Sequence, residues 1–304
     1  MYQYSPLDSE KLQIRLVELQ PGSWSDDVRC TVKIVDFAIA PAYECLSYVW
    51  GDAKVQRTIH VDGKPFNITG NLWLAMRRLR QIDAPRVLWV DAISIHQEDG
   101  HEKTQQVQMM GDIYKKCRLC IIWLGEDSGI IDGDLTSAVA QQVVEMLHIL
   151  SKGSHLHEMP CFSVIEGQRT DIPESYKPHF LALVEFLSLP WWRRIWIIQE
   201  MALPKTINFV YSSEEFSYDV LRSAVETLNS HAGGCCKDVR TSLRAEAFDP
   251  LLAVQEQVDP LVSIRETQKQ LLQTRLSQLR RQFHASEATN VKDLFYGLLG
   301  LVTS

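Results

Sequence analysis

The chain has 304 residues, enough for one large domain or a core with a helical annex, and its 45% hydrophobic and 23% charged residues are typical of folded proteins. Lys and Arg number 31 against 38 Asp and Glu, giving a formal net charge of -7, which argues against nucleic acid as a partner. The first ten residues lack the basic and apolar regions of a signal peptide, and no apolar run is long enough to span a bilayer. We therefore expect a cytoplasmic protein without a membrane span.

The chain begins with patterns typical of β-strands. Apolar and polar residues alternate from Val28 to Ile34, which follow a turn at Pro21-Gly22. The segments Arg57–Val61 and Pro65–Ile68 are joined by Asp62-Gly63, a pair typical of tight hairpin turns. These segments predict extra N-terminal strands and a hairpin beside the main sheet.

Three compact apolar runs alternate with helical patterns and predict the main sheet. The runs are Cys45–Val49, Leu88–Ala92 and Cys120–Leu124. Between them, Leu72–Leu79 and Lys103–Cys117 place apolar residues at helical spacing. Strand, helix, strand, helix, strand is typical of parallel pairing with right-handed crossovers, so we predict an α/β fold whose sheet is mostly parallel and flanked by helices.

The remaining chain is predicted to be mainly helical. One helix is expected at about Leu135–Leu150 and another at Trp191–Ala202, whereas 151–178 mixes Gly, Pro, His and Ser as a loop insertion does. We predict a single domain over the whole chain, in which 1–212 form the α/β core and 213–304 a helical annex. The chain stops directly after an apolar helix, which suggests a part of a longer protein.

The seven cysteines are an odd number scattered along the chain, which indicates reduced thiols rather than disulfides. Cys117 and Cys120 form a C-x-x-C motif, but the adjacent pair Cys235-Cys236 lacks the spacing of a second zinc-binding pair. His155 and His157 lie near Cys161 in a polar stretch that is typical of a solvated loop. The sequence therefore predicts no metal site.

Polar and aromatic side chains follow the predicted parallel strands at the edge of the sheet where ligands bind in open α/β folds. Ser94, His96, Glu98, Glu126 and Asp127 also follow these strands. The expected substrate-binding residues are Tyr48, Trp50, Gly51, Asp52, Asp91 and Gln97. Packing by Trp50 and helix capping by Asp91 are the alternative roles.

Glu200 is the candidate catalytic residue. It interrupts the apolar helix predicted at Trp191–Ala202, and a carboxylate in such a setting is either satisfied by buried hydrogen bonds or kept for function. From the residues alone, we favour a buried Glu that binds backbone N–H groups, and we place Arg193 and Arg194 at the surface or in ion pairs. The sequence contains no phosphate loop, nucleophile elbow or H-E-x-x-H motif.

Four segments, in this order and spacing, resemble successive motifs of the fungal heterokaryon incompatibility (HET) domain. They are Tyr43–Asp52, Ile68–Leu72, Leu88–Gln97 with Glu102-Lys103 and Gln106-Val107, and Ile113-Tyr114 through Trp123–Gly125. The similarity continues through Trp191–Glu200 and ends at Lys292–Gly300. Ser94 stands where family members usually carry Cys, which excludes a cysteine nucleophile at position 94. The other departures are His96, where family members carry Asn or Asp, and Val291-Lys292, where Pro-Arg is usual.

The resemblance implies a role in allorecognition, in which the meeting of incompatible partners triggers death of the fused cell. It also implies self-association, so the expected partners are a second copy of the chain or other cell-death signalling proteins. No cofactor is expected.

The HET family is in turn similar to TIR domains, which implies a TIR-like, flavodoxin-like sheet. In that comparison Glu200 matches the glutamate with which enzymatic TIR domains cleave NAD+. The resemblance thus implies an alternative function as an NAD+ glycohydrolase, with NAD+ as substrate and Glu200 stabilising the cationic ribose. Trp50 is then a stacking face and Asp91 a ribose contact.

Overall fold

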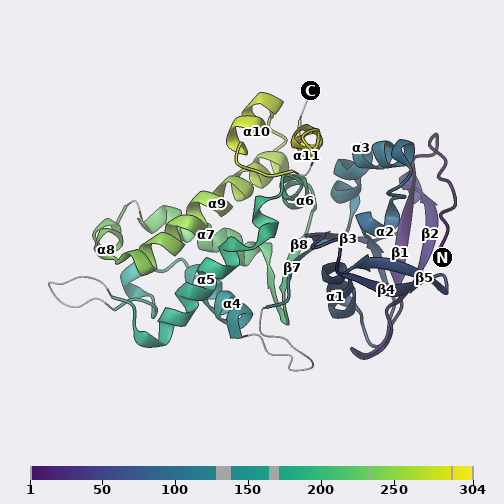
Figure 1. The fold of residues 1–304 in the computed structure, drawn as a ribbon. Coiled ribbons are helices and arrows are strands. Elements are labelled where there is room, and N and C mark those ends of the chain that lie inside the picture. The colour runs from purple at the N-terminus through teal and green to yellow at the C-terminus, as the bar shows by residue number, and fades with distance from the viewer. Residues whose placement is uncertain (1, 128–137, 164–170, 233, 289, 303–304) are drawn as a thin grey trace. The chain divides into compact units, whose positions relative to one another are not determined.

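The computed structural model describes residues 2–127, 138–163, 171–232, 234–288 and 290–302 (Figure 1). The chain divides into two compact units, each taken here by itself. The first contains Met1–Glu126, Arg194–Val210 and Gln273–Ser304, and the second contains Asp127–Arg193 and Tyr211–Leu272. The segment 213–304, predicted as one helical annex, is thus divided between the two units.

The first unit is built on a mixed sheet. Its strands lie in the order β5-β4-β2-β1-β6-β3-β7-β8. Their bounds are β1 (Gln13–Leu19), β2 (Arg29–Asp36), β3 (Glu44–Tyr48), β4 (Gln56–Val61), β5 (Lys64–Thr69), β6 (Arg86–Trp89), β7 (Leu119–Gly125) and β8 (Ile207–Tyr211). β1 pairs antiparallel with both β2 and β6, and β4 pairs antiparallel with β5. The sheet is therefore not mostly parallel, because the N-terminal strand joins its middle in the reverse direction.

The three strands predicted as the main sheet are neighbours. β3 lies between β6 and β7 and is parallel to both, with Cys45 opposite Trp89 on one side and Cys120 on the other. This part of the prediction is confirmed. β6 ends at Trp89, however, and Asp91–Ser94 form the short helix α2, in which the Ser94 N–H donates to the Val90 carbonyl at 2.7 Å and the Ile95 N–H to the Asp91 carbonyl at 3.1 Å.

The predicted hairpin is β4 and β5, turned at Asp62-Gly63. Both turn residues have positive φ, 49° for Asp62 and 73° for Gly63, which is the backbone of the two-residue turn that matches strand twist. Asn, Asp and Gly adopt this conformation at the least steric cost. The hairpin prediction is confirmed.

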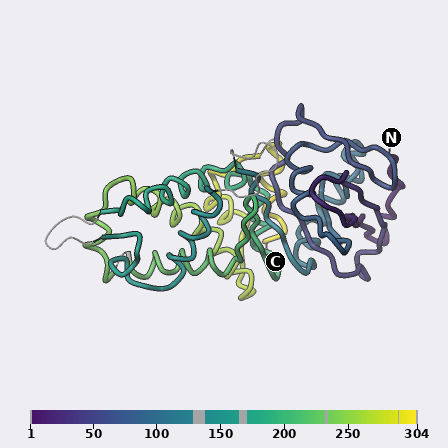
Figure 2. The backbone as a smooth tube through the Cα atoms, turned by 90° about the horizontal axis from the view of Figure 1, so that it is seen from below, coloured from purple at the N-terminus to yellow at the C-terminus, as the bar shows by residue number. Residues whose placement is uncertain are grey.

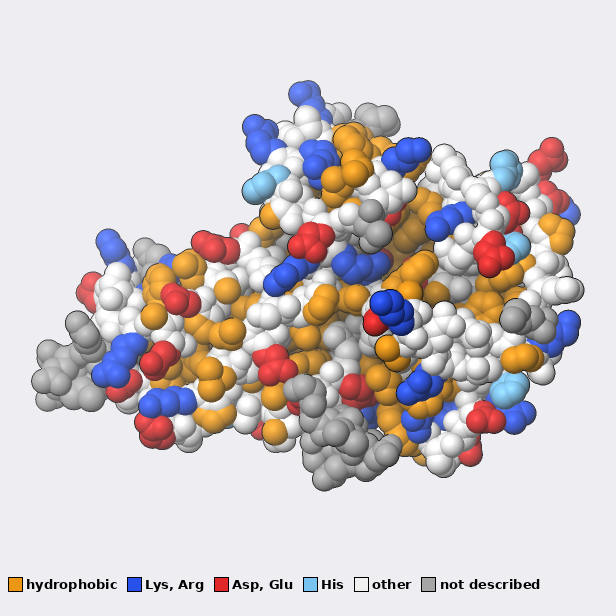
Figure 3. Space-filling model, viewed as in Figure 1, with side chains coloured by type: hydrophobic (Ala, Val, Ile, Leu, Met, Phe, Trp, Pro, Cys, Tyr) orange, Lys and Arg blue, Asp and Glu red, His pale blue; other side chains and the backbone are white. Residues whose placement is uncertain are grey.

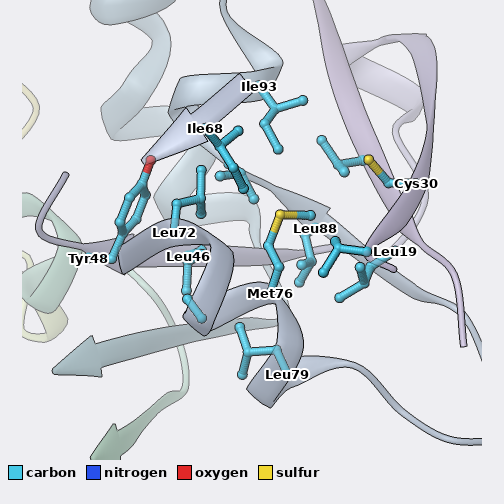
Figure 4. Close-up of a cluster of buried hydrophobic side chains, with 14 of the residues drawn as sticks. Leu19, Cys30, Leu46, Tyr48, Ile68, Leu72, Met76, Leu79, Leu88 and Ile93 are labelled. Carbon is cyan, nitrogen blue, oxygen red and sulfur yellow. The ribbon is translucent and has the colours of Figure 1, made fainter. Parts of the chain in front are cut away.

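Helix α1 (Gly70–Leu79) covers the hydrophobic core of the first unit. Leu72, Met76 and Leu79 point from one face of the helix towards side chains of the sheet, including Leu19 and Leu88 (Figure 4). All five are at most 3% exposed. The three to four residue spacing of the α1 residues explains why the sequence predicts this helix.

The apolar segment predicted as one helix, Trp191–Ala202, is interrupted. Pro190–Arg193 form a 3-10 helix and Ile197–Ala202 form α6. Between them the Ile195 N–H donates to the Glu287 carbonyl at 3.0 Å, so it is not available for a continuous helix. Glu287 lies in the C-terminal segment, and this partner was not predictable from the local pattern.

The C-terminal helices of the first unit are α10 (Leu276–Gln282) and α11 (Asp293–Leu299). α11 contacts α6 and α3 (Gly100–Lys116). The C-terminal segment is the yellow part of the tube in Figure 2. α11 therefore lies beside the helix that carries Glu200.

The second unit is mainly helical, with α4 and α9 each packed against α5 and α7. Its elements are α4 (Ala138–Leu150), the 3-10 helices Leu156–Glu158 and Glu174–Tyr176, α5 (Lys177–Ser188), β9 (Glu214–Ser217), α7 (Tyr218–Ala232), α8 (Lys237–Ser242) and α9 (Ala245–Lys269). The predicted insertion 151–178 thus contains short helical turns. Its residues 164–170, and 135–137 of the helix predicted before it, lie outside the described residues. Of the helices described, none has the length and apolar character required to cross a bilayer.

Candidate functional site

A cavity of about 650 Å³ opens in the first unit where β3 and β6 end. This volume lies within the range of small-molecule sites, about 300 to 1,000 Å³. The lining residues belong to the segments after β3 and β6, to α3 and α6, and to the C-terminal segment. They are Val49, Trp50, Gly51, Asp91, Ile95, Gln97, Lys103, Val107, Met110, Arg194, Trp196, Glu200, Glu287, Ala288, Asn290 and Asp293.

Five of the seven residues predicted for the site line this cavity: Trp50, Gly51, Asp91, Gln97 and Glu200. The other two do not belong to the lining. The Tyr48 hydroxyl donates to Asp91 Oδ1 at 2.9 Å and so supports a lining residue from behind. The Asp52 carboxylate accepts the Lys54 N–H at 2.9 Å in an exposed turn.

Asp91 is held by its neighbours in one orientation. Its carboxylate accepts hydrogen bonds from the Tyr48 hydroxyl, the Trp50 indole N–H at 2.8 Å and the Ala92 N–H. A carboxylate offers about four lone-pair sites, so capacity for a ligand hydroxyl remains. Gln97 donates to the Asp91 carbonyl at 2.9 Å, and its own buried Oε1 accepts no hydrogen bond from the residues that the structure describes.

The turn that carries Trp50 is fixed by Asn71 at the start of α1. Asn71 donates to the Val49 carbonyl at 2.6 Å and accepts from the Trp123 indole at 2.9 Å. Gly51 follows with a φ of 78°, and a Cβ there would lie 3.3 Å from the Asn71 Cβ. Gly51 is therefore required by backbone conformation and by close packing.

Glu200 lies on α6 at the cavity and is 3% exposed. Its Oε2 accepts a hydrogen bond of 2.5 Å from the Ser47 hydroxyl, which comes from buried β3. Burial raises the pKa of Glu200 above its usual value, while the Arg194 guanidinium and the Ser47 hydrogen bond act in the opposite direction. The carboxyl thus sits in a desolvated setting where its charge interacts strongly with any neighbouring cation.

Two cations and a C-terminal segment complete the lining, and none of them was predicted for the site. Arg194, predicted at the surface or in an ion pair, lines the cavity and donates to the Tyr48 carbonyl. Lys103 adds a second positive charge from α3. Glu287 and Asp293 belong to a C-terminal segment that does not follow any strand of the sheet. The rule that ligands bind beyond strand ends therefore cannot identify them.

Other polar residues near the strand ends have structural partners. The Ser94 hydroxyl accepts the Val90 N–H at 3.1 Å, and His96 stacks on Tyr4 with ring centroids 4.5 Å apart. Glu126 pairs with Arg78 at 2.8 Å. These contacts stabilise the fold around the cavity.

The C-x-x-C cysteines are buried core residues of the first unit. Both are 0% exposed, and Cys117 Sγ donates to the Tyr114 carbonyl at 3.1 Å. Within the described ranges, neither Cys117 nor Cys120 belongs to a cluster of three or more metal-binding side chains. That they bind no metal stays a prediction.

The sequence profile of the family described as Heterokaryon incompatibility protein (HET) matches residues 43–200, more than half of the chain. The chain belongs to the HET family. The matched region begins just before β3 and ends at Glu200, so it contains Ser47, Trp50, Asp91 and Arg194. The cavity residues Glu287 to Asp293 lie beyond it.

A curated relative is heterokaryon incompatibility protein 6, OR allele, of Neurospora crassa. It is 30% identical over 233 residues, which cover 66% of this chain and 33% of the relative. This HET-family chain therefore aligns with about a third of the length of that relative. No solved structure matches the chain.

Proposed function

We propose that this chain is a cell-death module of fungal allorecognition and that it acts through the cavity at Glu200, by hydrolysis of NAD+. Membership of the HET family and the name of the Neurospora relative support the cellular role. The observation that carries the molecular role is a buried carboxylate, with its pKa raised by burial, in the wall of a cavity of ligand size.

The cavity offers the groups that recognise a dinucleotide. Trp50 and Trp196 provide aromatic faces for flat rings, and Arg194 and Lys103 provide positive charge for a pyrophosphate. Asp91 provides an acceptor for ribose hydroxyls. Aromatic, cationic and acceptor groups around one cavity match the parts of NAD+.

Glu200 would act on the bond between nicotinamide and ribose. As that C–N bond breaks, its electron pair leaves with nicotinamide, which becomes neutral, and positive charge develops on the ribose. A nearby carboxylate stabilises this cation. Water then adds to the ribose carbon and loses a proton to solvent, so the products are nicotinamide, ADP-ribose and one proton.

We expect the purified chain to release nicotinamide from NAD+ at high protein concentration, measured by liquid chromatography. NADH is the matched control, because its dihydronicotinamide carries no positive charge and is a poor leaving group. Release of nicotinamide from NAD+, with no cleavage of NADH, supports the proposal. Intact NAD+ after prolonged incubation with folded protein, at concentrations where it associates, would refute the enzymatic role and leave the signalling role.

Self-association is the second candidate, and an apolar strip on the first unit favours it. Phe295 and Leu299 lie one helical turn apart on α11, with Val291 and Val302 on either side, and all four are exposed. Hydrophobic side chains gather over α10 and α11 in Figure 3. A surface of this kind is typical of protein contacts.

We expect the chain to associate with itself as its concentration rises in sedimentation velocity experiments. The double substitution Phe295→Ser with Leu299→Ser should weaken this self-association. Leu181→Ser on α5, where the side chain is 71% exposed, is the control and should change nothing. A parent chain that stays monomeric throughout would contradict this second role.

A further inference from the structure

We infer that the second unit holds a structural zinc ion, bound by His155, His231, Cys235 and Cys236. One ligand atom from each of these four side chains lies within 4.8 Å of the other three. His155 directly precedes the 3-10 helix Leu156–Glu158, His231 is in the last turn of α7, and the cysteines lie in the connection from α7 to α8. The inference is independent of the function proposed for Glu200.

The distances within the cluster are those of ligands around one tetrahedral ion. Cys235 Sγ lies 3.1 Å from His231 Nδ1 and 3.2 Å from His155 Nδ1. Cys236 Sγ lies 3.5 Å from His155 Nδ1 and 3.9 Å from Cys235 Sγ. Tetrahedral bonds of usual length place two sulfurs ~3.8 Å apart and a sulfur and a nitrogen ~3.5 Å apart. These four separations are therefore within about 0.5 Å of those around zinc, and the other two pairs of ligand atoms lie within 4.8 Å.

Contacts behind the ligands orient them for a metal. His231 Nε2 lies 3.2 Å from the Gly153 carbonyl, and a proton on Nε2 donated there leaves the Nδ1 lone pair directed at the cysteines. The Leu156 N–H lies 3.4 Å from Cys236 Sγ and can stabilise a thiolate. Metal-binding histidines usually donate their second N–H in this way, so the cluster has a supporting shell as well as ligands.

The ligand set selects the ion and its role. Two thiolates and two imidazoles in a tetrahedral arrangement favour zinc among the common metals, and the two thiolate charges neutralise Zn²⁺. Four protein ligands leave no position for water or substrate, as in structural sites. Zinc would join the loop after α4 to the connection between α7 and α8, two parts of the second unit that are far apart in the sequence.

This inference replaces the expectation of no metal. The adjacent pair Cys235-Cys236 lacks the spacing of the C-x-x-C motif, and His155 was predicted in a solvated loop. His155 and Cys235 are separated by 80 residues, and their Nδ1 and Sγ atoms meet only in the folded chain.

The test is to titrate the reduced, metal-free full chain with Co²⁺ and then with Zn²⁺. We expect one equivalent of Co²⁺ to give the visible bands of tetrahedral cobalt and a thiolate charge-transfer band, and one equivalent of Zn²⁺ to remove them. Cys235→Ser and His231→Gln should each weaken zinc binding more than about 100-fold, because loss of supporting contacts alone costs about 10- to 100-fold. The Cys235 side chain is exposed and that of His231 is partly exposed, so these variants should fold.

His157→Gln is the matched control, since its ring stacks on His155 at 5.3 Å but the residue does not belong to the cluster. It should bind one equivalent as the parent does. A reduced, folded parent without the tetrahedral spectrum, or Cys235→Ser and His231→Gln variants that bind as tightly as the parent, would overturn the inference.

Discussion

Replacing Glu200 with Gln is expected to lower the rate of NAD+ cleavage about 100-fold, equivalent to about 3 kcal/mol of barrier. The amide retains the size of the side chain and can still accept the Ser47 hydrogen bond. It carries no charge, however, and cannot stabilise the cation that forms on the ribose. Cell death on overexpression should be lost in parallel with nicotinamide release.

Glu287→Gln provides the matched control for this prediction. Glu287 also lines the cavity, but it is exposed, so water screens its charge. Its substitution should change the rate much less than Glu200→Gln. A folded Glu200→Gln chain that cleaves NAD+ and kills as well as the parent would show that the carboxylate is not catalytic.

The raised pKa of Glu200 also predicts how the stability of this variant depends on pH. A raised folded-state pKa contributes stability that is fully present below the unfolded-state pKa and is lost as the pH rises through the folded value. Gln does not titrate, so the free energy of unfolding of Glu200→Gln, relative to the parent, should increase with rising pH in denaturant experiments. If the difference in free energy of unfolding between Glu200→Gln and the parent did not change as the pH rises through the folded-state pKa of Glu200, this would argue against a desolvated carboxylate.

Local sequence patterns were sufficient to predict the strands that position the site. The apolar runs at β3, β6 and β7 and the Asp62-Gly63 turn are each specified by residues close in the chain. The rule that ligands bind beyond strand ends grouped Trp50, Asp91 and Gln97, and these three residues line one cavity; their role in binding stays a prediction.

Features that depend on distant partners were not predictable in this way. The position of β1 beside β6 makes the sheet mixed, and no pattern within either strand specifies that pairing. The break before α6 depends on the Glu287 carbonyl, 92 residues beyond Ile195. Arg194 lies in this break, and the prediction of a regular helix there gave no reason to place it in the site.

A buried ion pair, Arg15 with Glu102, supports the segment between the cavity residues Asp91 and Gln97. The two side chains form paired hydrogen bonds of 2.6 and 2.8 Å, and Arg15 also donates to the Ser94 carbonyl at 3.1 Å. Glu102 in turn accepts the His96 N–H at 2.8 Å. Arg15 is 0% exposed, so it has no access to solvent if its partner is removed.

Glu102→Ala is therefore expected to destabilise the chain by about 3–5 kcal/mol, because it leaves the buried Arg15 charge without its partner. Glu18→Ala is the control. Glu18 pairs with Lys33 at a similar distance, 2.5 Å, but the Lys33 side chain is 62% exposed, and such pairs contribute about 1 kcal/mol or less. Equal losses for the two variants in urea unfolding would contradict the role assigned to burial.

The pH dependence provides a second test of the Arg15–Glu102 pair. Burial acts to raise the pKa of Glu102, but the Arg15 guanidinium and the His96 N–H prevail and hold it below its usual value. A lowered folded-state pKa contributes stability that is present above the unfolded-state pKa and lost as the pH falls through the folded value. The difference in free energy of unfolding between the parent and Glu102→Ala should therefore shrink in acid. A difference that remains at low pH measures the neutral hydrogen bonds and packing that Glu102 provides.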